Sequence, residues 1–592
     1  MSHASTVLQS SYQKEFEKRR AWFISLYDSS KMVNYNVIAA RYATGNNVKL
    51  ADEMFEKLLQ EPRGDMFWMY RVIGCYLLGK DKMSAKTRKA VREAWRTYAP
   101  SRGDTENHWA LYYTCLLLAA EQWPGEAGNT WFDGASSSEK AAESKEYLIH
   151  WIKLTTTIGQ GEFDSPDYLH MFLIASTLLA EFSTDPEMRK RGEMLTDYLL
   201  ADYAVEHIDQ LYAGGHSRIY ERNLMQPKFC GASTIAYFYF ATGAPQRSGW
   251  MLYPLLTSYR MPEIIYQIAT DRSKPYVHRE IKRVRHVIRY GEERNPKVFK
   301  TTYMTQDYAL GSLHGGMLQP IQQLTWSVKY RHGRPTSMIF GLHPYWSIYE
   351  IGMFFPEEMK TVMAAITASK TTYNNPDKWT GGSPFERTFQ YKSTLLALYD
   401  IPAGTTSEHI DGFFPANLDE RILDDSGWIL CKAGDTYVAW YPLQPAVWSE
   451  EYQKAAAAFN EGTSSRANDG SLVLRNHRLR SHELQNGYVV EVQNREEAGS
   501  FEQFCAAVRS RIPEAVFSPD EVKVAYKTIH DDEMEFVFPD TRRLNGSTYE
   551  LDNDKLFSGP YLNADHGSEK LKISHGKKEL SLDFKKLEKT EK

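Results

Sequence analysis

A chain of 592 residues exceeds what a single hydrophobic core usually organises, so the sequence predicts two domains. Hydrophobic residues make up 42% and charged residues 24%, as in ordinary globular proteins, and no apolar run reaches the roughly 18 residues of a membrane span. The formal net charge of -5 argues against a surface that wraps polyanions, so we expect no nucleic-acid partner.

Metal and disulfide frameworks are not indicated. The five cysteines are odd in number and form no CxxC pair, and the histidines show no HExxH or other metal-ligand spacing. We therefore expect no cofactor and no catalytic metal, while a structural ion in the second half stays open. Residues 1–20 lack the apolar core of a signal peptide, so an expected periplasmic or secreted location requires that the signal has been removed.

Residues 1–297 have the apolar spacing of helices. The pattern is clear in "FWMYRVIGCYLLG", "WALYYTCLLLAAEQW" and "YLHMFLIASTLLAEF", and polar loops separate these segments. Successive helix pairs of similar length predict an α/α toroid, an incomplete barrel, or an irregular bundle.

Residues 298–592 show a different pattern, with short segments rich in β-branched and aromatic residues between turn formers. They predict an antiparallel β-sandwich domain that contributes to a cleft at the domain junction. One helix is expected in "SFEQFCAAVRSRI", and a final hairpin with a frayed, charged tail is expected at the end.

The first candidate site lies where "RGDTENHWALYY" enters an apolar helix. Asn107 supplies an amide donor and His108 a ring N–H, so the pair is able to grip both oxygens of a carboxylate. Trp109 offers an aromatic face for a sugar ring. The alternative is an ordinary helix start, where Asn is a favoured cap.

A second polar loop precedes the next helix. Glu162 and Asp164 lie in that loop, and Tyr168 and His170 lie at the helix start. Two such helix starts on one rim would form a cleft. The alternative is that this segment caps its own helix and that Tyr168 only packs.

The third and fourth candidates lie further along the chain. "YAGGHSRIYERN" carries His216, Arg218 and Tyr220, and its arginine is able to bind a carboxylate in bidentate fashion, unless neighbouring acids hold it. "TTYMTQDYALGSLHGG" carries Gln306, Tyr308 and His314 on a predicted strand facing the helical domain, where core packing is the alternative for the tyrosine.

These four stretches, in this order, resemble the heparinase II/III-like polysaccharide lyases, whose fold is an α/α toroid followed by a β-sandwich. Asn107-His108 matches the carboxylate-neutralising pair of the alginate-lyase branch, and Tyr168 lies close to the family's position for the catalytic tyrosine. His314 lies near where the family carries a second catalytic histidine. The resemblance covers about residues 100–490, and the residues around Tyr168 depart from those usual in heparinases.

By overall likeness, without a shared motif, the chain is also similar to polysaccharide lyase family 27. That family cleaves the L-rhamnose-α-1,4-D-glucuronate linkages that cap arabinogalactan. The resemblance implies an acidic oligo- or polysaccharide substrate, and metal-independent β-elimination that leaves an unsaturated uronate.

Two other classes of function stay open. A glycoside hydrolase on the same helical architecture would use paired carboxylates, for example Glu162 with Asp164 or Asp307. A non-catalytic glycan-binding protein would need no reacting groups. The oligomeric state is not predicted.

Overall fold

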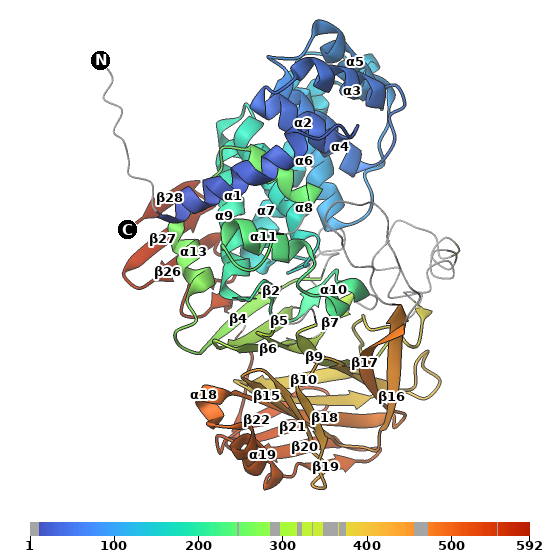
Figure 1. Ribbon diagram of the computed structural model, residues 1–592, viewed down its shortest axis with the longest axis vertical. Coiled ribbons are helices and arrows are strands. Elements are labelled where there is room, and N and C mark those ends of the chain that lie inside the picture. Colours follow the sequence, from blue (N-terminus) through green and yellow to red (C-terminus); the bar gives the residue numbers. More distant parts are fainter. Residues whose placement is uncertain are drawn as a thin grey trace.

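Helices form one half of the molecule and antiparallel sheets the other (Figure 1). The computed structural model describes residues 11–245, 248–284, 297–315, 322–333, 336–346, 361, 365, 374–454, 472–552 and 554–592. The predicted order of helices followed by sheets is confirmed. Closure of the helices into an α/α toroid stays a prediction.

The helical half is built from consecutive helices that pack on their neighbours in sequence, as α6 does on α7 and α8 on α9. Their bounds are α1 Ser11–Asp28, α2 Tyr35–Thr44, α3 Val48–Leu59, α4 Met66–Gly79, α5 Ala85–Thr97, α6 Glu106–Gln122, η1 Gly128–Thr130, α7 Ser137–Ile158, α8 Leu169–Phe182, α9 Pro186–Val205, α10 Glu221–Met225, α11 Gly231–Tyr239, α12 Gly249–Leu256 and α13 Glu263–Thr270. Helices α4, α6 and α8 pack against one another, and each is buried along nearly its whole length. This burial explains why their sequences are almost continuously apolar.

Antiparallel strands form the second half, and three short strands, β1 to β3, lie between α9 and α10 in the helical half. Their bounds are β1 His207–Ile208, β2 Leu211–Tyr212, β3 His216–Ser217, β4 Tyr276–Lys282, β5 Val298–Met304, β6 Tyr308–Gly315, β7 Gln323–Leu324, β8 Trp326–Tyr330, β9 Met338–Leu342, β10 Glu386–Tyr391, β11 Thr394–Asp400, β12 Ile410–Pro415, β13 Glu420–Leu423, β14 Ile429–Ala433, β15 Thr436–Pro442, β16 Val447–Lys454, β17 Leu472–Ser481, β18 Gln485–Asn494, β19 Glu514–Phe517, β20 Val522–Lys527, β21 Glu533–Val537, β22 Thr541–Leu544, β23 Ser547–Thr548, β24 Lys555–Ser558, β25 Leu562–Asp565, β26 Lys570–His575, β27 Lys578–Asp583 and β28 Glu588–Glu591. A 13-stranded sheet has the order β16-β17-β12-β9-β8-β6-β5-β4-β24-β25-β26-β27-β28, and a six-stranded sheet the order β10-β11-β18-β15-β14-β13.

These two sheets pack face to face. Tyr308, Leu310 and Trp326 of the large sheet share one core with Leu395 and Trp440 of the six-stranded sheet. On its other face, the six-stranded sheet packs on a five-stranded sheet, β19 to β23, and on α19. Helix α19, Phe501–Arg509, confirms the helix expected in this half, and short α18, Arg495–Ala498, precedes it.

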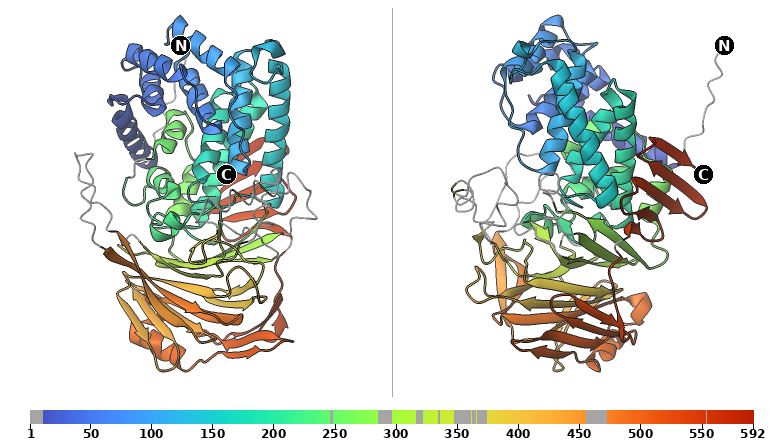
Figure 2. Two further views of the ribbon diagram at one scale, coloured as in Figure 1. Left: turned by 90° about the vertical axis from the view of Figure 1, so that its right-hand side faces the viewer. Right: turned by 180° about the vertical axis from the view of Figure 1, so that it is seen from behind.

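The last strands return to the helices. β24 pairs with β4, and β26 and β27 lie beside α13 (Figure 2). Apolar residues of these strands, among them Phe557 and Phe584, belong to the helical core. The expected final hairpin is confirmed as β26–β27, but the expected frayed tail is wrong, because β28 pairs with β27.

The junction between the two halves lies on one face of the large sheet. β4 begins at Tyr276, before the change of pattern at residue 298, and its register with β5 places Glu280 opposite Lys300. On β6, Gly311 faces Gly214 of the helical half. A Cβ at Gly311 would lie 2.3 Å from the Gly214 Cα, so only glycine permits this approach.

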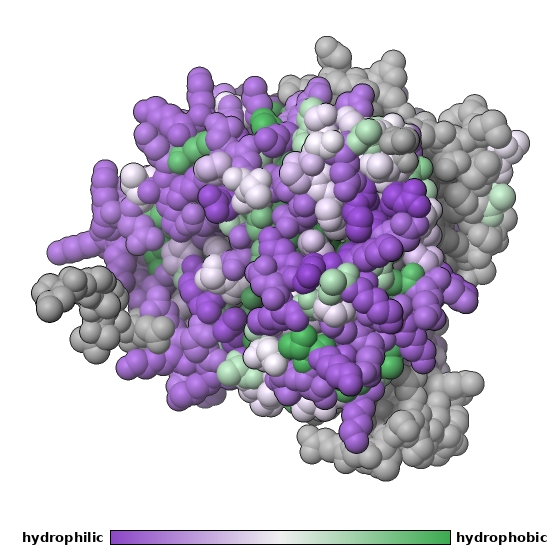
Figure 3. All heavy atoms as spheres, turned by 90° about the horizontal axis from the view of Figure 1, so that it is seen from above, coloured by the Kyte–Doolittle hydropathy of each residue, from purple (hydrophilic) through white to green (hydrophobic). Residues whose placement is uncertain are grey.

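The surface at the helical end is mostly hydrophilic, with scattered hydrophobic residues (Figure 3). Within the described residues, no helix combines the length and the apolar character that a membrane crossing requires.

We expect Gly311→Ala to lower the free energy of unfolding by about 1–3 kcal/mol, because overpacking forces two backbone segments apart. Denaturant unfolding of the full chain measures the change. The matched control is Gly333→Ala, whose added Cβ meets no described atom within 4 Å. Equal stability of the two variants would contradict the close approach.

Candidate functional site

Five polar side chains meet where three segments of the helical half converge. They come from the first turn of α6, from the loop before α8 and from the loop after β3. We call them the Glu162 cluster; its members are Asn107, Glu162, Tyr168, Arg218 and Tyr220.

The Glu162 carboxylate is the centre of this cluster and is 1% exposed. Its Oε2 accepts from the backbone N–H of Asn107 at 3.0 Å and from the Asn107 side-chain Nδ2 at 2.5 Å. Its Oε1 lies 2.9 Å from Arg218 Nε. One buried carboxylate therefore fixes both an amide and a guanidinium, as buried charges require.

Arg218 is held from several sides. Its φ of 55° lies in the left-handed region, and its carbonyl accepts from Ser165 Oγ at 2.8 Å. The same Ser165 Oγ accepts from the Tyr168 backbone N–H at 3.1 Å, so one hydroxyl ties the two loops together. The Arg218 guanidinium donates to Gln322 Oε1 and lies 4.6 Å from the centre of the Tyr168 ring, which is a cation–π contact.

Two tyrosines form the outer part of the cluster. The Tyr168 and Tyr220 hydroxyls are 2.5 Å apart, and both side chains are half-buried. Burial raises the pKa of the Tyr168 phenol above its ordinary value, and the Arg218 charge opposes that rise. Arg222 lies 4.5 Å from the Tyr220 ring centre and pairs with Asp167 at 2.5 Å. Two cations thus flank a hydrogen-bonded pair of phenols.

The prediction that Asn107 and His108 grip one carboxylate together is wrong in its geometry. Successive residues of a helix diverge by about 100°. Asn107 is fully buried, and its Nδ2 donates to Thr105 Oγ1 at 2.9 Å as well as to Glu162, so it acts as a positioning residue. His108 is half-buried and lies edge-on to Phe67, with ring centroids 5.5 Å apart.

Two predicted histidines are enclosed. His216 Nδ1 lies 2.7 Å from the Asp164 carbonyl, and burial and the neighbouring Lys329 hold its pKa well below the ordinary range. Burial lowers the pKa of His170 to about 4, and its ring packs edge-on to Trp250. Both shifts favour the neutral form of the ring. Contact with a ligand, which we predicted for both, is contradicted by their complete burial.

Trp109 and Gln306, which we predicted to bind substrate, are not members of the Glu162 cluster. Trp109 is half-buried near the start of α6, where its Nε1 donates to the Gly103 carbonyl at 3.0 Å and Arg102 covers its ring. Gln306 is exposed in the turn between β5 and β6, away from the Glu162 cluster.

Tyr308 and His314 lie on the face of the large sheet that points away from the helical half. Tyr308 donates to Glu497 Oε2 at 3.0 Å inside the β core, and His314 Nδ1 lies 3.0 Å from the Thr388 carbonyl of β10. Burial lowers the pKa of His314 to about 3. The alternate residues of β6, such as Gly311 and Leu313, face the helical half instead. The prediction that Tyr308 and His314 complete the site is therefore wrong.

Three neighbours of the site were not predicted. Phe67 and Trp250, at the starts of α4 and α12, are half-buried and nearly parallel, with centroids 6.5 Å apart and planes at 11°. Their only signal in the sequence was an aromatic residue at a helix start. Gln322, the partner of Arg218, had no signal.

Two groups of side chains within the described residues have distances suited to a metal ion. They are Asp202, His278 and Glu280, and Asp164, Glu206 and Glu280. Neither group includes a member of the Glu162 cluster.

No protein-family model matches the chain, and no curated protein matches it. Solved structures similar to it include a heparinase III with methylated lysines, with a TM-score of 0.36 and 9% identity over 90% of this chain and 85% of that one. A Paenibacillus xanthan lyase has a TM-score of 0.41 and 9% identity, over 95% of this chain and 61% of that one. Streptomyces coelicolor A3 chondroitin AC lyase, in complex with chondroitin sulphate, has a TM-score of 0.41 and 10% identity, over 98% and 90%.

We expect Glu162→Gln to lower the free energy of unfolding by about 3–5 kcal/mol, because it leaves the buried Arg218 charge without its carboxylate. Denaturant unfolding gives the value. Glu15→Gln, which removes an exposed pair with Lys18, should leave the free energy of unfolding nearly unchanged. A Glu162→Gln variant as stable as this control would show that the ion pair does not hold the cluster.

Proposed function

We propose that the chain is a polysaccharide lyase that cleaves a glycosidic bond to a uronic acid by β-elimination. The observation that carries the proposal is the hydrogen-bonded pair of Tyr168 and Tyr220 beside Arg218. The sequence resemblance to heparinase II/III-like lyases supports the same reaction.

The reaction needs three capabilities. The proton on C5 of a uronate is weakly acidic, because its removal adds a second negative charge next to the carboxylate. Cationic donors beside that carboxylate stabilise the enolate-like state, and loss of one such donor typically costs about 3 kcal/mol. We assign this role to Arg218, with Arg222 and the half-buried His108 as further donors.

A base must take the C5 proton and an acid must protonate O4 as the C4–O4 bond breaks. We assign both tasks to Tyr168: its phenolate takes the proton, the C5 electrons form the C4–C5 double bond, and the phenol returns a proton to the departing O4. The Tyr220 hydroxyl lies 2.5 Å from the Tyr168 hydroxyl; once Tyr168 is ionised, Tyr220 must be the donor, and its hydrogen bond stabilises the phenolate. Asn107 and Glu162 position Arg218 and the helix start.

The substrate we propose is a rhamnosyl-glucuronate cap of arabinogalactan, in a periplasmic or secreted setting. Both points rest on the sequence resemblance. Phe67 and Trp250 offer parallel aromatic faces near His108, and such faces stack on the apolar sides of sugar rings.

The carboxylates named for the hydrolase alternative, Glu162, Asp164 and Asp307, are all engaged in other contacts. Glu162 is paired with Arg218, and Asp164 is paired with Lys282 and Lys300. Asp307 lies in the turn between β5 and β6, where it accepts from Asn494. Each carboxylate that we considered for hydrolysis is therefore engaged in holding the structure.

We expect Tyr168→Phe to lower kcat at least about 100-fold on a glucuronate-containing glycan, because the base and acid are lost together. Formation of the unsaturated uronate, followed by its ultraviolet absorbance, gives the rate. The matched control is Tyr308→Phe, which removes a phenol from the β core and should leave kcat unchanged. Retained turnover in Tyr168→Phe would refute the assignment, and a saturated product would refute elimination.

We expect kcat/KM to rise as pH increases from 7 into the alkaline range. The pKa of Tyr168 is raised, so the reactive phenolate is a minor species at neutral pH and its fraction grows about tenfold per pH unit. A pH profile of the initial rate, taken where the fold is intact by circular dichroism, measures this. A profile that is flat or falls with pH would mean that another group is the base.

A further inference from the structure

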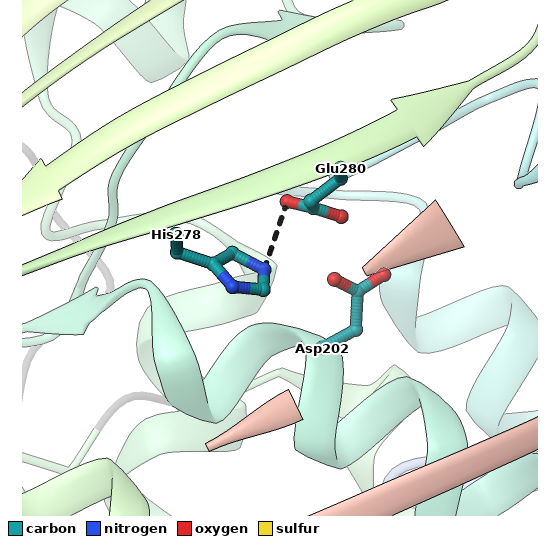
Figure 4. Close-up of side chains that lie close together, drawn as sticks. All are labelled: Asp202, His278 and Glu280. Carbon is teal, nitrogen blue, oxygen red and sulfur yellow. Dashed lines mark ion pairs between the residues drawn. The ribbon is translucent and has the colours of Figure 1, made fainter. Parts of the chain in front are cut away.

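A second polar cluster lies entirely inside the molecule, between α9 and the large sheet. On β4, His278 and Glu280 point to the same face, toward Asp202 of α9 (Figure 4). Lys282, two residues further along the strand, binds Asp202 as well. The register with β5 places Lys300 beside Glu280. We call it the junction cluster; its members are Asp164, Asp202, Glu206, His278, Glu280, Lys282 and Lys300.

The junction cluster has more negative than positive charge. Its four carboxylates and two ammonium groups are each 3% exposed or less, so their formal sum is two negative charges. Uncompensated charge in a protein interior costs several kcal/mol per ion. One divalent cation would bring the sum to zero, and two protons would do the same.

The donor atoms around His278 converge. His278 Nε2 lies 3.5 Å from Glu280 Oε1, and one ligand atom from each of Asp202, His278 and Glu280 lies within 4.8 Å of the others. Two ligands about 2.1 Å from one metal ion in tetrahedral geometry are themselves about 3.4 Å apart. The three side chains would therefore share one ion if their ligand atoms moved slightly closer together.

Two of these donor atoms have no hydrogen-bond partner among the described residues. Among the described residues, none completes a hydrogen bond with His278 Nε2 or with Asp202 Oδ1, although both side chains are buried. Lys282 Nζ instead binds the other oxygen of Asp202, Oδ2, at 2.7 Å and lies 2.5 Å from Glu280 Oε2, while Lys300 Nζ lies 3.1 Å from Glu280 Oε1. An ammonium that holds the outer oxygens of two carboxylates orients their inner oxygens, as outer-shell partners do in metal sites.

We propose that Asp202, His278 and Glu280 bind a divalent first-row transition ion between α9 and β4. One imidazole nitrogen with two carboxylate oxygens suits Zn²⁺ and its neighbours in the row better than Ca²⁺, which prefers six or more oxygens. The all-oxygen group of Asp164, Glu206 and Glu280 is a poorer site, because it has no imidazole and Lys300 contacts all three of its carboxylates. In the proposed group, Lys300 contacts only Glu280.

The consequence of such an ion is structural. It would join a helix of the helical half to the first strand of the large sheet, next to Asp164 and hence to the loop that carries Glu162 and Tyr168. The site is separate from the Glu162 cluster, so the proposal does not depend on the proposed lyase activity.

The test uses the full chain expressed in zinc-supplemented medium, and then treated with a chelator under mild denaturation and refolded. Elemental analysis before treatment should give about one Zn²⁺ per chain, and adding Zn²⁺ to the refolded protein should raise its melting temperature, while Ca²⁺ should not. Less than about 0.1 Zn²⁺ per chain with no shift in melting temperature would overturn the proposal. Stabilisation by Ca²⁺ alone would also overturn it.

Two variants locate the ion. His278→Gln should weaken Zn²⁺ binding by more than the roughly 10- to 100-fold that loss of an outer-shell partner causes. The matched control is His207→Gln, which alters another fully buried histidine outside the junction cluster and should keep the stoichiometry. Unchanged affinity in His278→Gln would refute the site. If that variant fails to fold, zinc X-ray absorption of the wild type decides, because a coordination shell with sulfur or without imidazole would refute the site equally.

Discussion

The ion pairs of Asp164 with Lys282 and Lys300 join the two halves of this protein. Asp164 belongs to the loop before α8, whereas the two lysines belong to β4 and β5. Its φ of 51° is an unfavourable backbone conformation for a residue with a side chain, and the surrounding contacts must maintain it. Tyr212 adds a hydrogen bond to Asp164 Oδ1 at 2.8 Å. Because each of these groups is buried, removing any one of them would leave a buried polar or charged partner without compensation, which strongly destabilises the fold.

The position of the Tyr168–Tyr220 pair depends on these ion pairs of Asp164. Glu162 precedes Asp164 by two residues, and His216, which contacts the Asp164 carbonyl, precedes Arg218 by two. Both loops of the Glu162 cluster are therefore fixed at one end by the junction. Arg218 has the same kind of left-handed backbone as Asp164. The backbone that carries the guanidinium to the Tyr168 ring is therefore constrained. Such rigidity is what an electrostatic role requires, since donors must be aimed before charge develops.

Much of the fold could be predicted from the sequence, because helical spacing and strand composition are local signals. Three of the four polar stretches could be associated with the site by their place before buried helices or after glycines. The directions in which the side chains point were not predicted correctly. Asn107 and His108 are neighbours in sequence but leave the helix at different angles, and both faces of β6 are buried, so the parity that turns Tyr308 and His314 away from the helices leaves no trace in hydrophobicity.

The return of the final strands to the helices links folding to the direction of protein synthesis. β4 is made near the middle of translation, yet its outer neighbour β24 comes from residues 555–558. Until that segment leaves the ribosome, β4 presents an unpaired edge, and the helical core lacks Phe557 and Phe584. The helical core, which is translated first, is thus completed only after the last strands of the chain have been made.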